Sequence, residues 1–228
     1  MTRRQAVVAL VLVCLVWGAS FTVLKQTLQY TSPLMLLGVR FGLATLLITA
    51  GFRGLTREQA VGGLVLGGLF WAGFVFQTNG LQHTTPSRSA FLTILSTPLV
   101  PVLQFLIHRT LPRGPTLAAI ALAVAGTWLL TSPAGGDGLN RGDLLTIGCA
   151  ILFTGQIVAA GHYAARMPIA RLLALELGSC AVLSLVSAPL LEVPRLVPSW
   201  PYAAMMAFLA FTGLWSFRTQ LRAQQVLS

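Results

Sequence analysis

The sequence predicts an all-α, polytopic membrane protein, and three observations support that fold class. Hydrophobic residues make up 55% of the chain and charged residues only 9%, whereas a soluble domain carries about 25% charged residues. A water-soluble fold of this size could not bury so much apolar side chain. The apolar runs are continuous over about 20 residues, the length of a helix that spans a bilayer core. A transmembrane β-barrel would instead show alternating segments of about ten residues.

The first apolar run, Ala6–Leu28, follows the basic residues Arg3 and Arg4. This arrangement resembles a signal peptide, with Gly18-Ala19-Ser20 as a cleavage site of small residues. The run is longer than the roughly 7–15 apolar residues of a signal peptide. We therefore expect an uncleaved first span.

Further apolar runs follow, and proline or glycine marks most of the breaks between them. Each of these runs is long enough for a membrane helix, or nearly so. The eight expected spans are Ala6–Leu28, Pro33–Gly51, Ala60–Gln82, Ser87–Ile107, Pro115–Thr131, Leu144–Tyr163, Ile169–Leu191 and Pro201–Leu221.

Basic residues in the loops predict the orientation, because cytoplasmic loops of membrane proteins carry an excess of Lys and Arg. If the N-terminus is cytoplasmic, the outer loops hold only Arg88, Arg141 and Arg195. The cytoplasmic ends then hold Arg3, Arg4, Arg53, Arg57, Arg109, Arg113, Arg166, Arg171, Arg218 and Arg222. We expect a multi-pass protein of the plasma (inner) membrane with a cytoplasmic N-terminus. The basic residues are spread singly, so the net charge of +10 does not indicate nucleic-acid binding.

The stretch Val13–Thr49 returns in outline in the second half of the chain, as a match of hydropathy and special positions. The corresponding positions are Trp17 and Phe153, Arg40 and Glu176, and Gly42 and Gly178. Five expected spans precede the glycine-rich outer loop Ser132–Arg141, so the two halves would have opposite topology. Inverted repeats of this kind are typical of secondary transporters.

The chain resembles the drug/metabolite transporter (DMT) superfamily in its EamA branch. The matching residues are Leu15-Val16-Trp17-Gly18-Ala19-Ser20-Phe21, Leu36–Leu43 with its arginine, Gly80-Leu81-Gln82-His83-Thr84-Thr85-Pro86-Ser87-Arg88-Ser89-Ala90-Phe91-Leu92 with Pro98 and Pro101, Gly126–Leu130, and Gly142-Asp143-Leu144-Leu145. The resemblance implies two repeats of five helices each. Residues 1–132 would be the first repeat, 133–143 an external linker, and 144–228 an incomplete second repeat. On this alignment, three helices of the second repeat are present of an expected five, which suggests truncation after the eighth helix.

Arg40 and Glu176 are the charges nearest the middle of expected spans. Charges inside a membrane are costly and usually face a cavity or a partner. We expect them to line a central pathway, and Glu176 could also carry a proton. The alternatives are a structural ion pair, or side chains that reach toward the cytoplasmic interface.

Polar and aromatic residues inside the spans are further candidates for the wall of a substrate cavity. Helical spacing places Trp17, Ser20 and Phe21 on one face of the first span, and Trp71 lies in the middle of the third span. Such faces suit a mostly apolar solute with one polar end. Packing between helices is the alternative for these aromatic residues, and helix bridging is the alternative for the polar groups. The polar candidates are Gln77, Thr93 and Gln156.

Two further patterns concern helix geometry. Gly63 and Gly67 form a GxxxG pair, which favours close packing of helices. Pro98 and Pro101 should bend the fourth span, because a proline removes a backbone hydrogen bond. The carbonyls of Ile94 and Thr97 would be freed.

The sequence carries no motif of an enzyme, a metal site or a cofactor site, and its cysteines lie singly in apolar runs. We therefore expect a secondary transporter that exports a small metabolite or amphipathic organic compound by alternating access. The expected partners are the lipid bilayer, a small organic solute, protons as a candidate coupling ion, and a second copy in a homodimer. The alternative is a membrane scaffold without transport activity, or a truncated remnant of a transporter.

Overall fold

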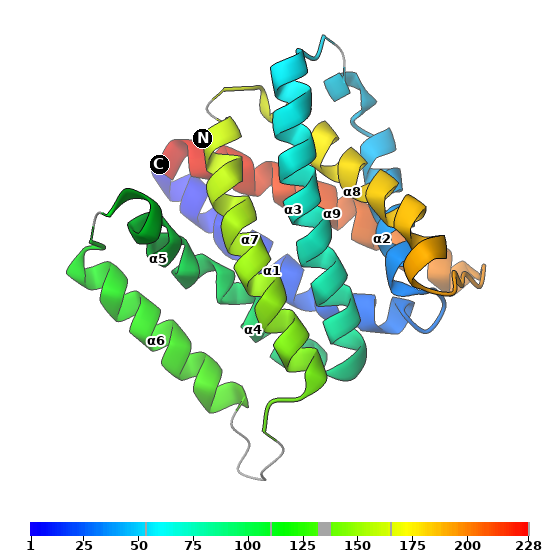
Figure 1. Cartoon of the computed structure of the whole chain (residues 1–228), viewed down its shortest axis with the longest axis horizontal. Coiled ribbons are helices and arrows are strands. Elements are labelled where there is room, and N and C mark those ends of the chain that lie inside the picture. The colour runs from blue at the N-terminus through cyan, green and yellow to red at the C-terminus, as the bar shows by residue number, and fades with distance from the viewer. Residues whose placement is uncertain (53, 110, 132–137, 165, 228) are drawn as a thin grey trace. The chain divides into compact units, whose positions relative to one another are not determined.

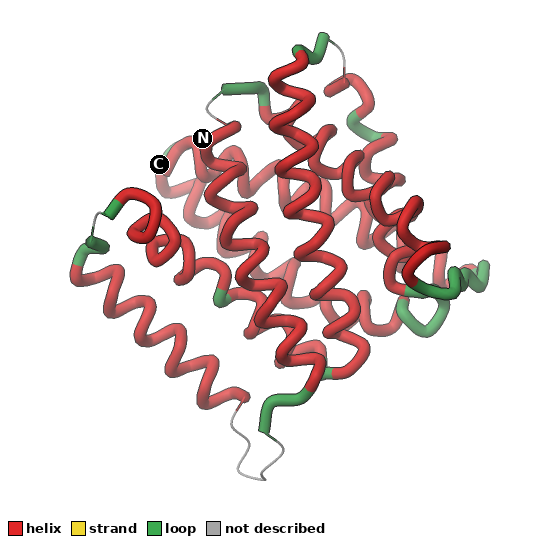
Figure 2. Tube along the Cα trace, in the orientation of Figure 1, coloured by secondary structure: helices red, strands yellow, loops and turns green. Residues whose placement is uncertain are grey.

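The computed structural model describes residues 1–52, 54–109, 111–131, 138–164 and 166–227. Figure 2 shows that these residues are almost entirely helical. They contain no β-strand beyond one isolated antiparallel bridge between Thr31 and Leu196. The expected all-α fold is confirmed.

The helices follow the expected spans closely, and Ile169–Leu191 coincides with its expected range (Figure 1). The helices of the described residues are α1 (Arg3–Thr27), α2 (Pro33–Leu46), α3 (Arg57–His83), α4 (Pro86–Ile94), α5 (Ser96–His108), α6 (Gly114–Thr131), α7 (Arg141–Ala164), α8 (Ile169–Leu191) and α9 (Trp200–Leu227), with a 3₁₀ turn η1 (Thr49–Phe52). Residue 132, at the end of the expected first repeat, and residues 133–137 of the expected external linker lie outside the described residues.

The fourth expected span is interrupted at Leu95, which separates α4 from α5. In a continuous helix, residue 98 would donate its N–H to the Ile94 carbonyl, but Pro98 has no N–H. The Leu95 N–H instead bonds the Leu92 carbonyl at 3.3 Å, three residues back. The fourth span is thus interrupted just before the first of the two prolines expected to bend it, Pro98, at the boundary of α4 and α5 at Leu95.

The second expected span, Pro33–Gly51, is longer than the helix in the structure, because α2 ends at Leu46. The chain then tightens into i→i−3 hydrogen bonds, such as the Gly51 N–H to the Ile48 carbonyl at 2.9 Å. Gly51 lies so close to α8 that an added Cβ would be 2.4 Å from the Ala170 carbonyl oxygen. The close packing against α8 thus accompanies the end of the regular helix.

The chain divides into two compact units, which are described separately. Unit 1 comprises Met1–Trp71 and Ala160–Ser228, and unit 2 comprises Ala72–Ala159. In unit 1, α2 packs against α8 and α1 packs against α9. In unit 2, α4, α5 and α6 contact one another, and the second half of α3 lies against α7, where a Cβ on Gly73 would meet the Phe153 ring at 2.5 Å.

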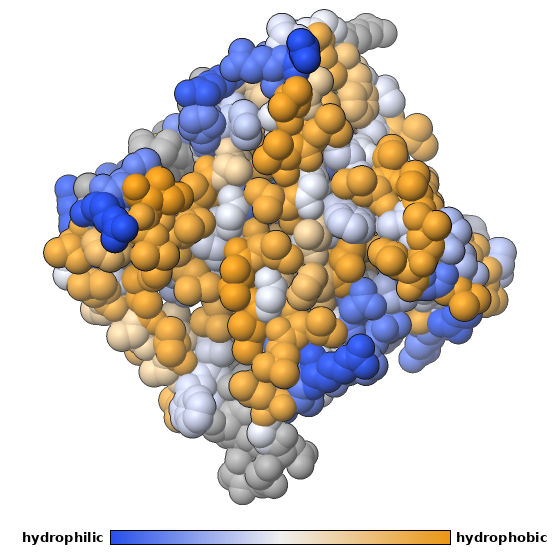
Figure 3. Space-filling view, in the orientation of Figure 1, coloured by the Kyte–Doolittle hydropathy of each residue, from blue (hydrophilic) through white to orange (hydrophobic). Residues whose placement is uncertain are grey.

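The protein is a polytopic membrane protein by the length and composition of its helices. Within the described residues, five helical segments are long and apolar enough to cross a membrane, namely Arg3–Thr27, Arg57–His83, Pro86–His108, Arg141–Ala164 and Ile169–Leu191. Pro33–Leu46 and Gly114–Leu129 are shorter apolar helices. Many large hydrophobic side chains are exposed, among them Leu15, Leu122 and Val186. Figure 3 shows hydrophobic residues, in orange, over most of the helical surface that it presents.

Candidate functional site

Arg40 is a buried charge on α2, in unit 1, with 3% of its surface exposed. Its Nε donates a hydrogen bond to the Leu209 carbonyl of α9 at 3.3 Å. Its guanidinium carbon lies 5.0 Å from the centroid of the Phe41 ring. A Cβ on Gly213 would lie 3.2 Å from the guanidinium. Arg40 is therefore held within the helices, and the absence of a side chain at position 213 gives it room.

Glu176 on α8 is the second buried charge of unit 1, with 2% of its surface exposed. The Cys180 side chain, one turn along α8, lies within electrostatic reach of both Glu176 and Arg40. Both charges therefore act electrostatically on one thiol. Neither faces lipid, because both are almost completely covered by protein.

A series of aromatic contacts connects Trp17 to the surroundings of Arg40. Successive ring centroids lie 5.6 Å apart for Trp17 and Phe217, 5.1 Å for Phe217 and Phe70, and 5.3 Å for Phe70 and Phe41. Aromatic pairs at such distances stabilise a packed interior. We call the series Trp17, Phe217, Phe70 and Phe41 the aromatic wall; it comes from α1, α9, α3 and α2.

The other candidates on α1 are buried, but the structure gives them packing contacts. The Ser20 hydroxyl donates to the Trp17 carbonyl of its own helix at 2.7 Å. Phe21 is buried in the core. These positions support the helix on which Trp17 lies.

The buried side-chain atoms of unit 1 that have no hydrogen-bond partner among the described residues include the Trp71 indole Nε1 and the Ser216 hydroxyl. Trp71 was a candidate from the sequence, and Ser216 was missed. A serine in an apolar helix gives no signal of its own, because its hydroxyl usually bonds a carbonyl one turn back. Only the packing of α9 shows that Ser216 is completely buried.

Unit 2 brings together the polar candidates Gln77 and Thr93. The Gln77 amide nitrogen donates to the Thr93 hydroxyl at 3.3 Å, and Thr93 also hydrogen-bonds the buried Cys149 thiol. Gln156 lies two helical turns beyond Cys149 on α7 and is half-buried. The cluster therefore joins α3, α4 and α7 by polar contacts inside an apolar unit.

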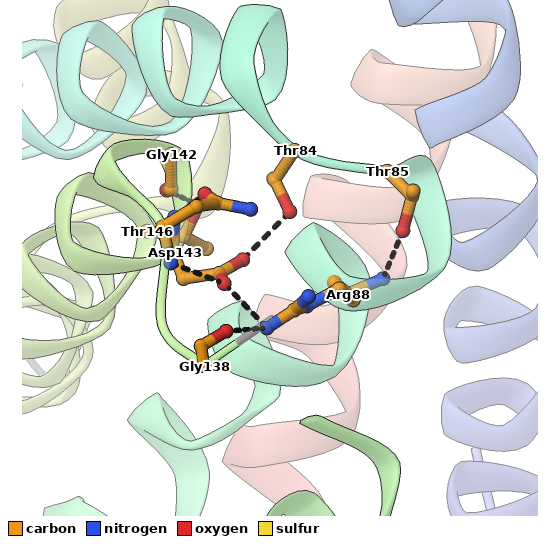
Figure 4. Close-up of polar contacts among 8 residues, drawn as sticks. Thr84, Thr85, Arg88, Gly138, Gly142, Asp143 and Thr146 are labelled. Carbon is orange, nitrogen blue, oxygen red and sulfur yellow. Dashed lines mark hydrogen bonds and ion pairs between the residues drawn. The ribbon is translucent and has the colours of Figure 1, made fainter. Parts of the chain in front are cut away.

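A buried ion pair in unit 2 joins the start of α4 to the start of α7 (Figure 4). Asp143 is fully buried, and its carboxylate lies 2.7 Å from an Arg88 guanidinium nitrogen. The Thr84 hydroxyl donates to the same carboxylate at 2.6 Å. The Arg88 guanidinium also donates to the Gly138 carbonyl at 2.9 Å. The sequence analysis used Arg88 as an outer-loop charge and included Thr84, Arg88 and Asp143 in the family resemblance, but it did not predict their contact.

Asp143 also caps its own helix. The Asn140 side chain accepts from the Asp143 N–H at 2.9 Å, and the Asp143 carboxylate accepts from the Asn140 N–H at 3.1 Å. This reciprocal pair is a capping-box arrangement. Gly142 makes the close approach of α3 possible, since a Cβ there would lie 2.5 Å from the Gly80 carbonyl oxygen.

A second carboxylate, Glu192 at the end of α8, caps α2 in unit 1. It accepts from the Leu34 and Met35 backbone N–H groups at 3.1 and 3.2 Å, and from the Ser32 hydroxyl. These N–H groups have no partner within the first turn of a helix, and the positive end of the helix dipole favours an anion there. Glu192 thereby fixes the start of the helix that carries Arg40.

No group of three or more His, Cys, Asp or Glu residues that could hold a metal ion occurs in the part of the chain that the structure describes. The candidate residues offer charge, hydrogen-bonding groups and aromatic rings.

Comparisons with known proteins agree with this picture. The sequence profile of the EamA-like transporter family matches residues 4–132. The chain is 32% identical over 161 residues to an uncharacterized transporter of Archaeoglobus fulgidus, an alignment that covers 71% of this chain and 50% of that protein. The chain thus spans about half the length of this curated relative. A chain in a crystal structure, described only as a protein, matches with a TM-score of 0.73 and 22% identity over 98% of this chain and 80% of that chain, which shows a shared fold.

Proposed function

Because the chain belongs to the EamA-like transporter family, we propose that it takes part in secondary transport across the plasma membrane. The cargo is a small metabolite or amphipathic organic compound, and the direction is export. The observation that carries the proposal is the burial of Arg40 and Glu176 on adjacent helices of an otherwise apolar unit. Charges are retained at such depth when they serve a pathway or a partner.

Helix packing supports an inverted repeat, with residues 1–132 and 144–228 as its two parts. In such a repeat, α1, α2 and α3 correspond to α7, α8 and α9. A two-fold axis would then pair α1 with α9 and α7 with α3, and would place α2 against α8. Trp17 of α1 packs on Phe217 of α9, and its counterpart Phe153 of α7 packs on Phe74 of α3. A Cβ on Gly38 of α2 would meet the Leu185 side chain of α8 at 2.6 Å.

Alternating access would use the smooth contacts between helices. Gly63 and Gly67 of α3 lie against Leu175 and Ser179 of α8. The two glycines have no side chain, so the backbones of α3 and α8 come close together at these positions. Small residues of this kind let helices approach closely. The helices around Arg40 would move against one another at such contacts, and exposure of the guanidinium to each side in turn would move the solute.

The proposal also includes a coupling ion, an orientation in the membrane and the partners of the chain. Glu176 is a candidate carrier of a coupling proton, because it is an ionisable group buried inside a membrane helix. The excess of Arg on one set of loops supports a cytoplasmic N-terminus. The exposed apolar surface contacts the bilayer, and a second copy of the chain is a candidate partner.

The test of the proposal is transport by the chain in proteoliposomes, with a panel of organic solutes. Arg40→Ala should reduce transport by roughly tenfold or more, because a hydrogen bond to a charged group contributes about 1.5–3 kcal/mol. Arg57→Ala is the matched control, because Arg57 is exposed at the start of α3. Equal transport by Arg40→Ala and Arg57→Ala, at equal insertion, would remove Arg40 from the pathway.

The orientation is tested separately by labelling single cysteines introduced at Thr2 and at Ser87 in a chain without native cysteines. A membrane-impermeant maleimide should reach position 87 from outside the cell and position 2 only after permeabilisation. The opposite pattern would reverse the proposed topology.

A further inference from the structure

Ser216 of α9 is the starting observation. Its side chain is completely buried, and its hydroxyl has no hydrogen-bond partner among the described residues. A buried polar group without a hydrogen-bond partner destabilises the folded protein, and such groups are rare in native structures. The hydroxyl is therefore available to a ligand that enters the helices.

The position of Ser216 on α9 relates it to Arg40. Leu209, Gly213 and Ser216 are spaced i, i+4 and i+7, so they lie on one face of the helix. The Arg40 guanidinium bonds the Leu209 carbonyl and approaches Gly213. Ser216 therefore lies on the same face of α9 as Gly213, about 4.5 Å further along the axis of that helix.

We propose that Arg40 and Ser216 form a subsite for the carboxylate of an aryl-substituted organic acid. The inference rests on the proposed transport function, and it names the chemistry of the solute's polar end. The guanidinium donates to the carboxylate oxygens in a planar fork, and the Ser216 hydroxyl donates a further hydrogen bond.

The charges nearby favour a singly charged group over a phosphate. Arg40 supplies one positive charge, which balances a single anionic charge. A dianion would place excess negative charge in a low-dielectric interior, where an unbalanced charge is costly.

The aromatic wall accounts for the apolar part of the solute. Phe217 follows Ser216 directly in the sequence and packs on Trp17 and Phe70. An aromatic ring attached to the carboxylate can contact these rings in the tilted or edge-to-face arrangements that aromatic groups prefer. The pairing of one carboxylate with one aromatic body follows from this arrangement.

The subsite is occluded, because Arg40 and Ser216 are 3% and 0% exposed. The solute would enter when α9 separates from α2. This movement would expose the guanidinium, which contacts Leu209 and Gly213 of α9, and the Ser216 hydroxyl on the same face of α9.

The test measures binding of 3-phenylpropionate and of its amide to the purified chain in detergent. The acid should bind wild type at least about tenfold more tightly than the uncharged amide, and Ser216→Ala should remove about tenfold of the acid's affinity and little of the amide's. Thr212→Ala on the same helix is the control, because the Thr212 hydroxyl already donates to the Phe208 carbonyl at 2.6 Å. In the absence of ligand, Ser216→Ala should unfold at the same or a higher temperature than wild type, since it removes an unpaired buried hydroxyl.

Each outcome bears on the subsite. Equal binding of acid and amide, no binding of either at millimolar concentration, or equal losses in Ser216→Ala and Thr212→Ala would overturn it. Transport of the amide by proteoliposomes would then still support the transport function. Conversely, acid binding that depends on Ser216 without movement across the membrane would keep the subsite and refute transport.

Discussion

Replacing Gly67 by alanine tests the contact between α3 and α8. A Cβ at this position would lie 2.4 Å from the Ser179 Cβ, whereas carbon atoms pack at about 3.5–4.0 Å. The two helices must therefore separate locally by more than about 1 Å. Such overpacking costs about 1–3 kcal/mol.

The adjacent glycine provides a matched control. A Cβ on Gly68 would meet nothing within 4 Å, so Gly68→Ala makes the same chemical change without a clash. Alanine is favoured over glycine inside a helix by up to about 1 kcal/mol. We expect Gly68→Ala to be neutral or stabilising.

The assay is thermal unfolding of the purified chain in detergent, followed by tryptophan fluorescence. For a chain of this size, 1 kcal/mol shifts the Tm by about 2–4 °C. Gly67→Ala should therefore lower the Tm by about 2–12 °C, and Gly68→Ala should not lower it. If the Gly67→Ala variant unfolds at or above the temperature of Gly68→Ala, the close packing of α3 on α8 is wrong.

Two further changes probe the buried carboxylates. Asp143→Asn removes the charge that Arg88 and Thr84 contact, so we expect it to lower the free energy of unfolding by about 2 kcal/mol. The control is Glu58→Gln, at an exposed position, which should change the free energy of unfolding by less than about 0.5 kcal/mol. Equal Tm values for these two variants would contradict a structural ion pair between Asp143 and Arg88. Glu192→Ala removes the carboxylate that caps α2 and should cost about 1–2 kcal/mol, measured in the same assay, with faster amide hydrogen exchange at the start of α2. Unchanged exchange there would show that the cap does not hold this helix end.

The helices were predictable from the sequence because the bilayer imposes their length and its absence of water imposes their backbone hydrogen bonding. Pro98 predicted a local disturbance of the fourth span, which the structure shows as an interruption at Leu95. The interior positions of Arg40 and Glu176 were also predictable, because a charge facing lipid is costly wherever the helix packs.

Tertiary structure alone determined which partners these helices use. Trp17 could have faced lipid or protein, and only the packing of α1 on α9 brought it against Phe217. Asp143 met Arg88, and the Ser216 hydroxyl was left buried without a hydrogen-bond partner among the described residues. The physical reason is that lipid and protein interior are both apolar, so the periodicity that reveals the buried face of a soluble helix is weak in a membrane helix.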